Sequence, residues 1–248
     1  MTFWDHLEDL RKSIFRMIGV LASVAVVLFF FKNFLFDDVV LAPAGSDFLL
    51  YRLVGIDFSL SLVNLEVAAQ FMIHMKVTFI CALILTFPYL IYEVWKFIAP
   101  ALYENEKKAV RGAFTFASVL FYVGIAVGYF IILPLMLNFF ADYQVSAAVP
   151  NMFSLSSYIS LLTSMVLTFG IVFEFPTLVA LLSALGILKR EWMKKYRRHA
   201  ICIVVILAAV ITPSGDPFSL AVVALPLYLL YEFSVYICKP EKAKTIEN

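Results

Sequence analysis

Long uninterrupted apolar runs are the feature that most constrains this chain. A membrane-spanning helix needs about 20 mostly apolar residues, because the hydrocarbon core is about 30 Å thick and a helix rises about 1.5 Å per residue. Four runs meet this length, at 14–36, 71–92, 110–140 and 158–185. Hydrophobic residues make up 63% of the chain and charged residues 15%, which excludes an ordinary soluble enzyme, a disordered chain and a nucleic-acid binder. The sequence therefore predicts an all-α polytopic membrane protein.

The C-terminal apolar region is divided by a turn-forming cluster. Runs at 199–212 and 218–237 flank Thr-Pro-Ser-Gly-Asp-Pro at 212–217, a composition that favours a turn. We interpret the two runs as a fifth and a sixth transmembrane helix, both short for a normal bilayer. We also expect kinked helices around a concave face, because four of the spans contain a proline: Pro88, Pro134, Pro176 and Pro226.

The positions of lysine and arginine predict the orientation. With six spans, 16 of the 19 basic residues lie in or beside the N-terminal segment, the loops 93–109 and 186–198, and the C-terminal tail. Because cytoplasmic segments are enriched in lysine and arginine, both termini are predicted to be cytoplasmic. The outer loops are then 37–70, 141–157 and 213–217. The sequence contains no internal repeat, so we expect a single membrane domain over residues 1–248.

Two segments on the predicted cytoplasmic side carry residues whose roles the pattern alone leaves open. Residues 2–14 have apolar side chains at helical spacing, which indicates a short amphipathic helix leading into the first span. In the loop 93–109, Trp95, Phe97 and Tyr103 are either membrane-interface anchors or one wall of a binding groove. Pro100 prevents a continuous helix through this loop.

Glu174 is the strongest anomaly inside a span. A carboxylate in the hydrocarbon region is costly unless it is protonated, paired or hydrated. Pro176 removes a backbone donor nearby and so frees a carbonyl group. Glu174 then either makes a structural hydrogen bond to another span, or it is a polar contact for a partner helix or a translocating chain. The sequence has no ligand spacing for a metal and no nucleotide-binding or hydrolase motif, so we predict no cofactor and no enzymatic activity.

Four segments resemble the TatC family, the core subunit of the twin-arginine protein translocase. Residues 6–11, His-Leu-Glu-Asp-Leu-Arg, are similar to the N-terminal signature of that family. Residues 92–103, followed by Glu106, resemble its first cytoplasmic loop, and 169–176 resemble its fourth span. Residues 212–232 resemble its last hairpin.

The resemblance implies a receptor that binds Arg-Arg signal peptides of folded proteins at its cytoplasmic face. It also implies self-association, assembly with single-span partners of the TatA and TatB types, and export driven by the proton gradient. The expected location is the bacterial cytoplasmic membrane, with both termini inside, rather than the thylakoid membrane. The alternative is a proton-coupled secondary transporter of small solutes, in which Glu174 is the proton or substrate site.

The implied recognition carboxylates are Asp9 and Glu106, since a carboxylate can accept both N–H groups of a planar guanidinium. The family usually has Glu where this chain has Asp9, so a shared role for Glu8 stays open. The other implied site residues are Arg11 in the signature, Phe97 and Pro100 beside the carboxylates, Glu174 and Pro176 as an intramembrane partner contact, and Pro213 and Asp216 in the outer hairpin.

Overall fold

The structure is a computed structural model, and it describes residues 3–56, 58–101, 104–146, 148–149, 151–212 and 214–238. For residues 3–6, 101 and 104–111 only the backbone is described. The α-helices are α1 (Phe3–Phe30), α2 (Leu49–Val54), α3 (Ala69–Ile98), α4 (Glu104–Val127), α5 (Leu133–Asp142), α6 (Leu155–Val172), α7 (Phe175–Ala184), α8 (Arg190–Lys195), α9 (Arg197–Ile211) and α10 (Pro217–Ile237). The shorter 3-10 and π segments are η1 (Phe34–Val40), η2 (Ala42–Ala44), η3 (Ala99–Ala101) and η4 (Gly128–Ile132), and the strands are β1 (Leu62–Val63) and β2 (Phe153–Ser154).

The fold is that of an all-α polytopic membrane protein. Within the described residues, five helical stretches are long and apolar enough to cross a bilayer: Leu7–Phe30, Ala69–Ile98, Gly112–Asp142, Leu155–Ala184 and Pro217–Ile237. The fifth predicted span corresponds to α9, whose 15 residues make it shorter than these five.

Helix α10 is longer than its uncharged part, residues 218–231, suggests. Its 21 residues rise about 31 Å, which matches a normal hydrocarbon layer. The helix continues past Glu232 because that carboxylate is paired with Arg197 and accepts a hydrogen bond from Tyr228. Of the two spans expected to be short, only α9 is short in the structure.

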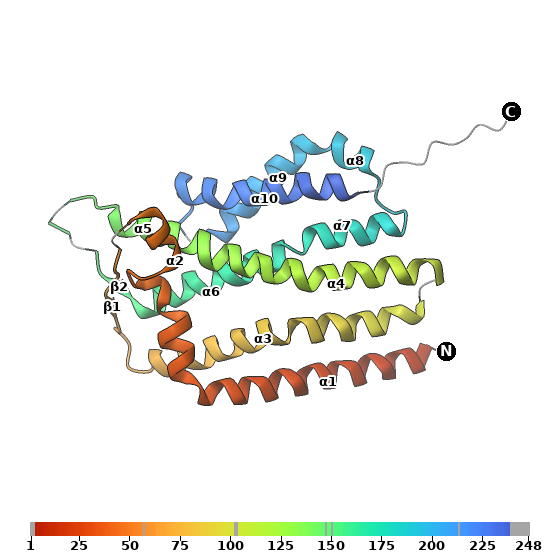
Figure 1. Ribbon diagram of the computed structural model, residues 1–248, viewed down its shortest axis with the longest axis horizontal. Coiled ribbons are helices and arrows are strands. Elements are labelled where there is room, and N and C mark those ends of the chain that lie inside the picture. Colours follow the sequence, from red (N-terminus) through yellow and green to blue (C-terminus); the bar gives the residue numbers. More distant parts are fainter. Residues whose placement is uncertain are drawn as a thin grey trace. The chain divides into compact units, whose positions relative to one another are not determined.

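The chain forms two compact units, the first of which comprises residues 1–100 and 124–169. Helices α1 and α3 lie side by side and antiparallel in this unit, so the start of α1 is next to the end of α3 (Figure 1). The core of the unit is apolar, and two buried tyrosines connect the segment 37–70 to it. The hydroxyl of Tyr158 in α6 donates to the carbonyl of Val40 at 2.7 Å. The hydroxyl of Tyr51 donates to the carbonyl of Pro43 within that segment at 3.2 Å and lies 3.5 Å from the carbonyl of Pro134 in α5.

Two loops of this unit, both predicted to be outer loops, are joined by a short parallel strand pair. Leu62 pairs with Phe153 and Val63 with Ser154, so β1 of the loop 37–70 meets β2 of the loop 141–157. Strands of two residues leave no periodic pattern in the sequence, and the prediction of an all-helical chain did not include them. The strand pair joins these two loops at one place.

The second unit comprises residues 101–123 and 170–248. Helix α10 packs against α7 and α9 in this unit, and α8 contacts both α9 and α10. Tyr231 of α10 is buried, and its hydroxyl donates to the carbonyl of Met193 in α8 at 2.6 Å. Cys238, also buried, donates from its thiol to the hydroxyl of Ser183 at 3.4 Å.

Only two of the four prolines stand where a helix is interrupted. Pro134 lies in the first turn of α5, just after the π segment η4, and Pro176 lies in the first turn of α7, just after α6 ends. Pro88 and Pro226 instead lie inside α3 and α10, which continue through them. Proline removes one backbone donor in each case, and in lipid the freed carbonyl is compensated by local rearrangement.

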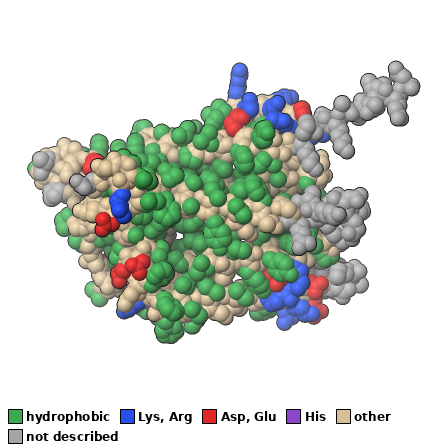
Figure 2. All heavy atoms as spheres, viewed as in Figure 1, with side chains coloured by type: hydrophobic (Ala, Val, Ile, Leu, Met, Phe, Trp, Pro, Cys, Tyr) green, Lys and Arg blue, Asp and Glu red, His purple; other side chains and the backbone are tan. Residues whose placement is uncertain are grey.

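Large apolar side chains cover the outward faces of the long helices. Phe30 of α1 is 79% exposed, and Phe15 and Val210 are also largely exposed. Figure 2 shows the same property, since hydrophobic side chains occupy most of the face in view. Such surfaces are stable in hydrocarbon and not in water, which agrees with a protein embedded in lipid.

Close backbone packing at Gly128 leads to a stability prediction. A Cβ at this position would lie 3.1 Å from the carbonyl oxygen of Met165 and 3.1 Å from Cβ of Phe169, both in α6. We expect Gly128→Ala to lower the free energy of unfolding by about 1–3 kcal/mol, the usual cost of overpacking. Gly19→Ala is the matched control, because no atom lies within 4 Å of its added Cβ. Thermal unfolding in detergent measures both, and equal stability of Gly128→Ala and wild type would contradict the prediction.

Candidate functional site

A polar pocket lies where the start of α1 meets the end of α3. Its volume is about 310 Å³. Antiparallel packing of the two helices brings residues from positions far apart in the sequence to this place (Figure 1). The lining residues are Asp9, Lys12, Ser13 and Arg16 of α1, Lys96 and Phe97 of α3, and Pro100 of η3.

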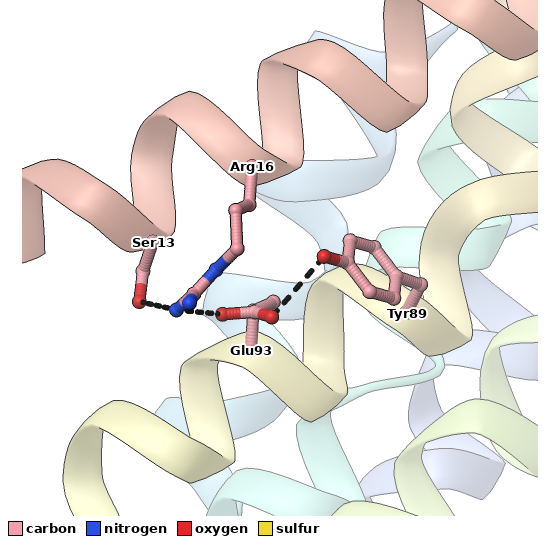
Figure 3. Close-up of polar contacts among 4 residues, drawn as sticks. All are labelled: Ser13, Arg16, Tyr89 and Glu93. Atoms are coloured by element: carbon pink, nitrogen blue, oxygen red, sulfur yellow. Dashed lines mark hydrogen bonds and ion pairs between the residues drawn. The ribbon is translucent and has the colours of Figure 1, made fainter.

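An ion pair with a buried carboxylate connects the two helices beside this pocket. The Nη2 atom of Arg16 donates to Oε2 of Glu93 at 2.9 Å and to the hydroxyl of Ser13 at 3.0 Å. The Tyr89 hydroxyl donates to the other oxygen of Glu93, Oε1, at 3.1 Å (Figure 3). Glu93 is only 4% exposed, whereas the side chain of Arg16 is 46% exposed. The carboxylate is therefore satisfied on both oxygens, and the guanidinium reaches it from the pocket wall.

The two acidic residues of the N-terminal signature, Glu8 and Asp9, make different contacts in the structure. Glu8 forms an ion pair with Lys12 at 2.9 Å, one turn further along α1. Asp9 is exposed and lines the pocket, and the structure gives it no ion pair with any described side chain. Arg11 is directed elsewhere, because its guanidinium lies over the ring of Phe15 at 5.8 Å from the centroid. Of Glu8, Asp9 and Arg11, only Asp9 lines the pocket.

The end of α3 places the remaining residues of the predicted recognition site. The helix ends at Ile98, and Pro100 lies in the 3-10 turn that follows, as the proline predicted. Phe97 is half-buried and Pro100 exposed, and together they form the apolar part of the pocket wall. The side chain of Glu106 lies outside the described residues; its backbone belongs to the first turn of α4.

The sequence reasoning did not include Ser13, Arg16, Tyr89 or Glu93 in the site. Two signals in the sequence point to them. Arg16 is a cation inside the apolar run 14–36, and Glu93 follows Tyr89 by four residues, which places both side chains on one face of a helix. Nothing in the sequence pairs α1 with α3, so only the tertiary structure identifies Arg16 as the partner of Glu93.

Glu174 and Pro176 lie at the junction of α6 and α7. Glu174 immediately precedes α7, and Pro176 is buried in its first turn. The side chain of Glu174 is half-buried, and its Oε1 atom is fully buried without a hydrogen-bond partner in the described part of the chain. An unsatisfied buried carboxylate oxygen is costly in this environment. A group that supplies a donor would therefore bind there favourably.

A second ion pair of the same design joins α9 to α10. Arg197 pairs with Glu232 at 2.6 Å through Nη2 and Oε2, and the Tyr228 hydroxyl donates to Oε1 of Glu232 at 3.0 Å. As with Glu93, a tyrosine four residues before the glutamate serves one oxygen and an arginine of the neighbouring helix serves the other. This pair does not line the pocket between α1 and α3.

In the predicted outer hairpin, Asp216 caps the N-terminus of α10. Its carboxylate accepts from the backbone N–H of Ser219 at 2.8 Å and from the hydroxyl of Ser214. Partial burial acts to raise the pKa of Asp216, but the hydrogen bonds from Ser214 and Ser219 outweigh it and lower the pKa to about 2. Pro213 lies outside the described residues. The arrangement accounts for Asp216 as a helix cap.

Comparison with known proteins agrees with this fold. Residues 5–226 match the family described as the Sec-independent protein translocase protein TatC. The TatC protein of Blattabacterium sp. (strain BPLAN) is 39% identical over 96% of this chain and 94% of its own length. The TatC protein of Halothiobacillus neapolitanus is 33% identical over 96% of this chain and 62% of its own length. A crystal structure described as the twin-arginine translocase receptor TatC in DDM superimposes with a TM-score of 0.78 at 28% identity, covering 94% of this chain and 99% of that one.

The apolar helices and the match to translocase proteins define a multi-pass membrane protein that serves in protein transport. Such a protein is a subunit of a translocation machine, acting with other components, rather than an enzyme. The chain belongs to the TatC family and is a core subunit of a Tat translocase.

Removal of the cap at Asp216 gives a second stability prediction. Asp216→Ala leaves the first N–H groups of α10 without their acceptor, and we expect a loss of about 0.5–2 kcal/mol in the free energy of unfolding. Asp216→Asn is the matched control, because asparagine caps helices about as well as aspartate. Since the folded-state pKa is about 2, below the ordinary value of 3.8, the cap contributes fully above about pH 4 and is lost as the pH falls towards 2. Thermal unfolding at neutral pH compares the variants, and equal losses for Ala and Asn would refute a capping role.

Proposed function

We propose that this chain is the receptor subunit that binds Arg-Arg signal peptides of folded proteins in the pocket between α1 and α3. The observation that carries this proposal is that Asp9, Phe97 and Pro100, which are distant in the sequence, line one pocket. The structurally similar crystal structure is described as that of a twin-arginine translocase receptor, which supports the same function here.

Asp9 and the apolar part of the pocket wall suit a guanidinium followed by an apolar segment. Asp9 offers a carboxylate that accepts two parallel hydrogen bonds from an arginine, whereas Glu8 is occupied by Lys12. Phe97 and Pro100 offer an apolar surface for the residues beside the arginines. Glu106 is proposed as the second acceptor, because two adjacent arginines require two carboxylates. Lysine lacks the planar fork, so a Lys-Lys peptide is expected to bind more weakly.

We further propose that the pocket faces the cytoplasm of a bacterium, with both termini on that side of the inner membrane. The basic residues support this orientation, since Arg11, Lys12 and Lys96 lie at the pocket end of α1 and α3. The loop 186–198, which the sequence predicts to be cytoplasmic, is also rich in basic residues. Signal peptides emerge from synthesis in the cytoplasm, so a receptor site must open there.

Assembly with single-span partners of the TatA and TatB types forms the second part of the proposal, together with self-association in the complex. The unpartnered Oε1 of Glu174 supports an intramembrane contact with a polar residue of a partner helix. A partner donor would satisfy this oxygen, and the energy released would favour association within lipid. Transport is proposed to draw on the proton gradient.

The recognition site is tested by peptide binding. We expect Asp9→Ala and Glu106→Ala each to weaken binding of an Arg-Arg signal peptide by about 10- to 100-fold, the value of a charge-assisted hydrogen bond. Replacement of Arg-Arg by Lys-Lys in the peptide should produce a similar loss with the wild-type protein. Fluorescence anisotropy of a labelled peptide with purified protein in nanodiscs measures these affinities.

Two carboxylates serve as controls for this experiment. Glu8→Ala should change affinity much less than Asp9→Ala, because Glu8 is paired with Lys12. Asp142→Asn, in the predicted outer loop, should leave affinity unchanged. If Lys-Lys and Arg-Arg peptides bind equally well to the wild-type protein, the proposed receptor function is wrong.

The role of Glu174 is tested by its replacement with leucine. A partner contact predicts that Glu174→Leu reduces co-purification of TatA- and TatB-type subunits several-fold, whereas its thermal stability equals or exceeds that of wild type because an unsatisfied oxygen is removed. Glu174→Gln is the matched control of similar size that keeps hydrogen-bonding capacity. A structural hydrogen bond within the subunit instead predicts that the leucine variant is less stable, with partner binding intact among the folded molecules.

A further inference from the structure

We propose that Arg16 and Glu93 are positioning residues for the signal-peptide site, because their ion pair sets which face of α1 is presented to α3 and so holds Asp9 at the pocket. This inference rests on the proposed receptor function. It adds residues that do not belong to the implied recognition set and assigns them a role that does not require contact with the peptide.

The contacts of Arg16 and Glu93 hold α1 and α3 together at one position. Glu93 has both oxygens occupied, one by Arg16 and one by Tyr89, and it is almost fully buried (Figure 3). A buried carboxylate that lost its cation would be left uncompensated, which is strongly unfavourable. The pair is therefore expected to persist, and with it the rotation of α1 that brings Arg16 to Glu93.

Helical geometry transmits this rotation to the recognition residue. Asp9 precedes Arg16 by seven residues, which is close to two turns, so both side chains lie on the same face of α1. On α3, Lys96 and Phe97 follow Glu93 by about one turn and line the pocket opposite Asp9. If α1 were rotated about its axis by one residue, Asp9 would turn by about 100° and leave the pocket.

Apolar packing alone specifies this rotation poorly. Only 6% of the 18-residue apolar window within Leu7–Phe30 is buried, and most side chains of this stretch are exposed. In lipid, apolar helix faces gain little from burial against one another, because hydrocarbon is an equally good solvent for them. The Arg16–Glu93 pair supplies a polar contact that favours one rotation of α1 over the others.

A purely electrostatic role for Arg16 makes the opposite prediction. Lys12, Arg16 and Lys96 all line the pocket, so the cation at position 16 repels the arginines of a peptide. If charge were its only influence, Arg16→Met would strengthen binding of an Arg-Arg peptide. A positioning role predicts that the same variant weakens it.

The experiment measures the ratio of affinities for an Arg-Arg peptide and its Lys-Lys form, using full-length protein in nanodiscs. Arg16→Met is expected to lower the Arg-Arg preference about tenfold, the size of one charge-assisted hydrogen bond. Glu93→Gln is expected to lower it less, because glutamine still accepts a hydrogen bond. Arg16→Lys should retain most of the preference, since only one nitrogen of Arg16 contacts Glu93.

The second ion pair provides a matched control. Arg197→Met and Glu232→Gln remove the equivalent contact between α9 and α10, and we expect them to leave the Arg-Arg preference unchanged. The preference is a ratio, so loss of folded protein alone lowers the amount that binds both peptides and leaves the ratio where it is.

The outcomes separate the two proposals. A wild-type protein without preference for Arg-Arg overturns the receptor function and this inference together. A wild-type preference that Arg16→Met leaves unchanged or increases overturns the inference and leaves the receptor function intact. If Arg16→Met does not fold, Glu93→Gln decides: a reduced preference supports positioning, and a wild-type preference refutes it.

Discussion

The structure depends on one constraint: a backbone surrounded by hydrocarbon must satisfy its own hydrogen bonds. Lipid offers no partner for an N–H or C=O group, so spanning segments become helices over nearly their whole length. Helices α3 and α10 continue through Pro88 and Pro226 even though each proline lacks a donor. Non-helical backbone is concentrated in the loops, where strands, turns and caps provide the missing partners.

The same constraint governs charged side chains. In both interhelical ion pairs, an arginine of one helix neutralises a glutamate of the next, and a tyrosine one turn earlier serves the remaining oxygen. Glu93 and Glu232 can therefore be buried or half-buried without an unsatisfied oxygen. Each pair links two neighbouring helices at a defined rotation, which apolar surfaces in lipid do not specify by themselves.

Glu174 departs from this pattern. Its Oε1 atom is buried without a partner among the described residues, although it lies in a span where such an omission is costly. Asp216 shows the contrast, since every feature of that carboxylate is explained by capping α10.

Much of this protein is determined by its sequence alone. The apolar runs predict the long helices, Pro100 predicts the end of α3, and the four family-like segments predict membership of the TatC family, because hydropathy and motifs are local properties. The β1–β2 pair, the choice of Asp9 over Glu8 as the residue that faces the pocket, and the pairing of Arg16 with Glu93 were decided only by the tertiary structure. Each of these depends on which helices and loops become neighbours, and a membrane sequence leaves that open because its apolar faces suit lipid and protein equally well.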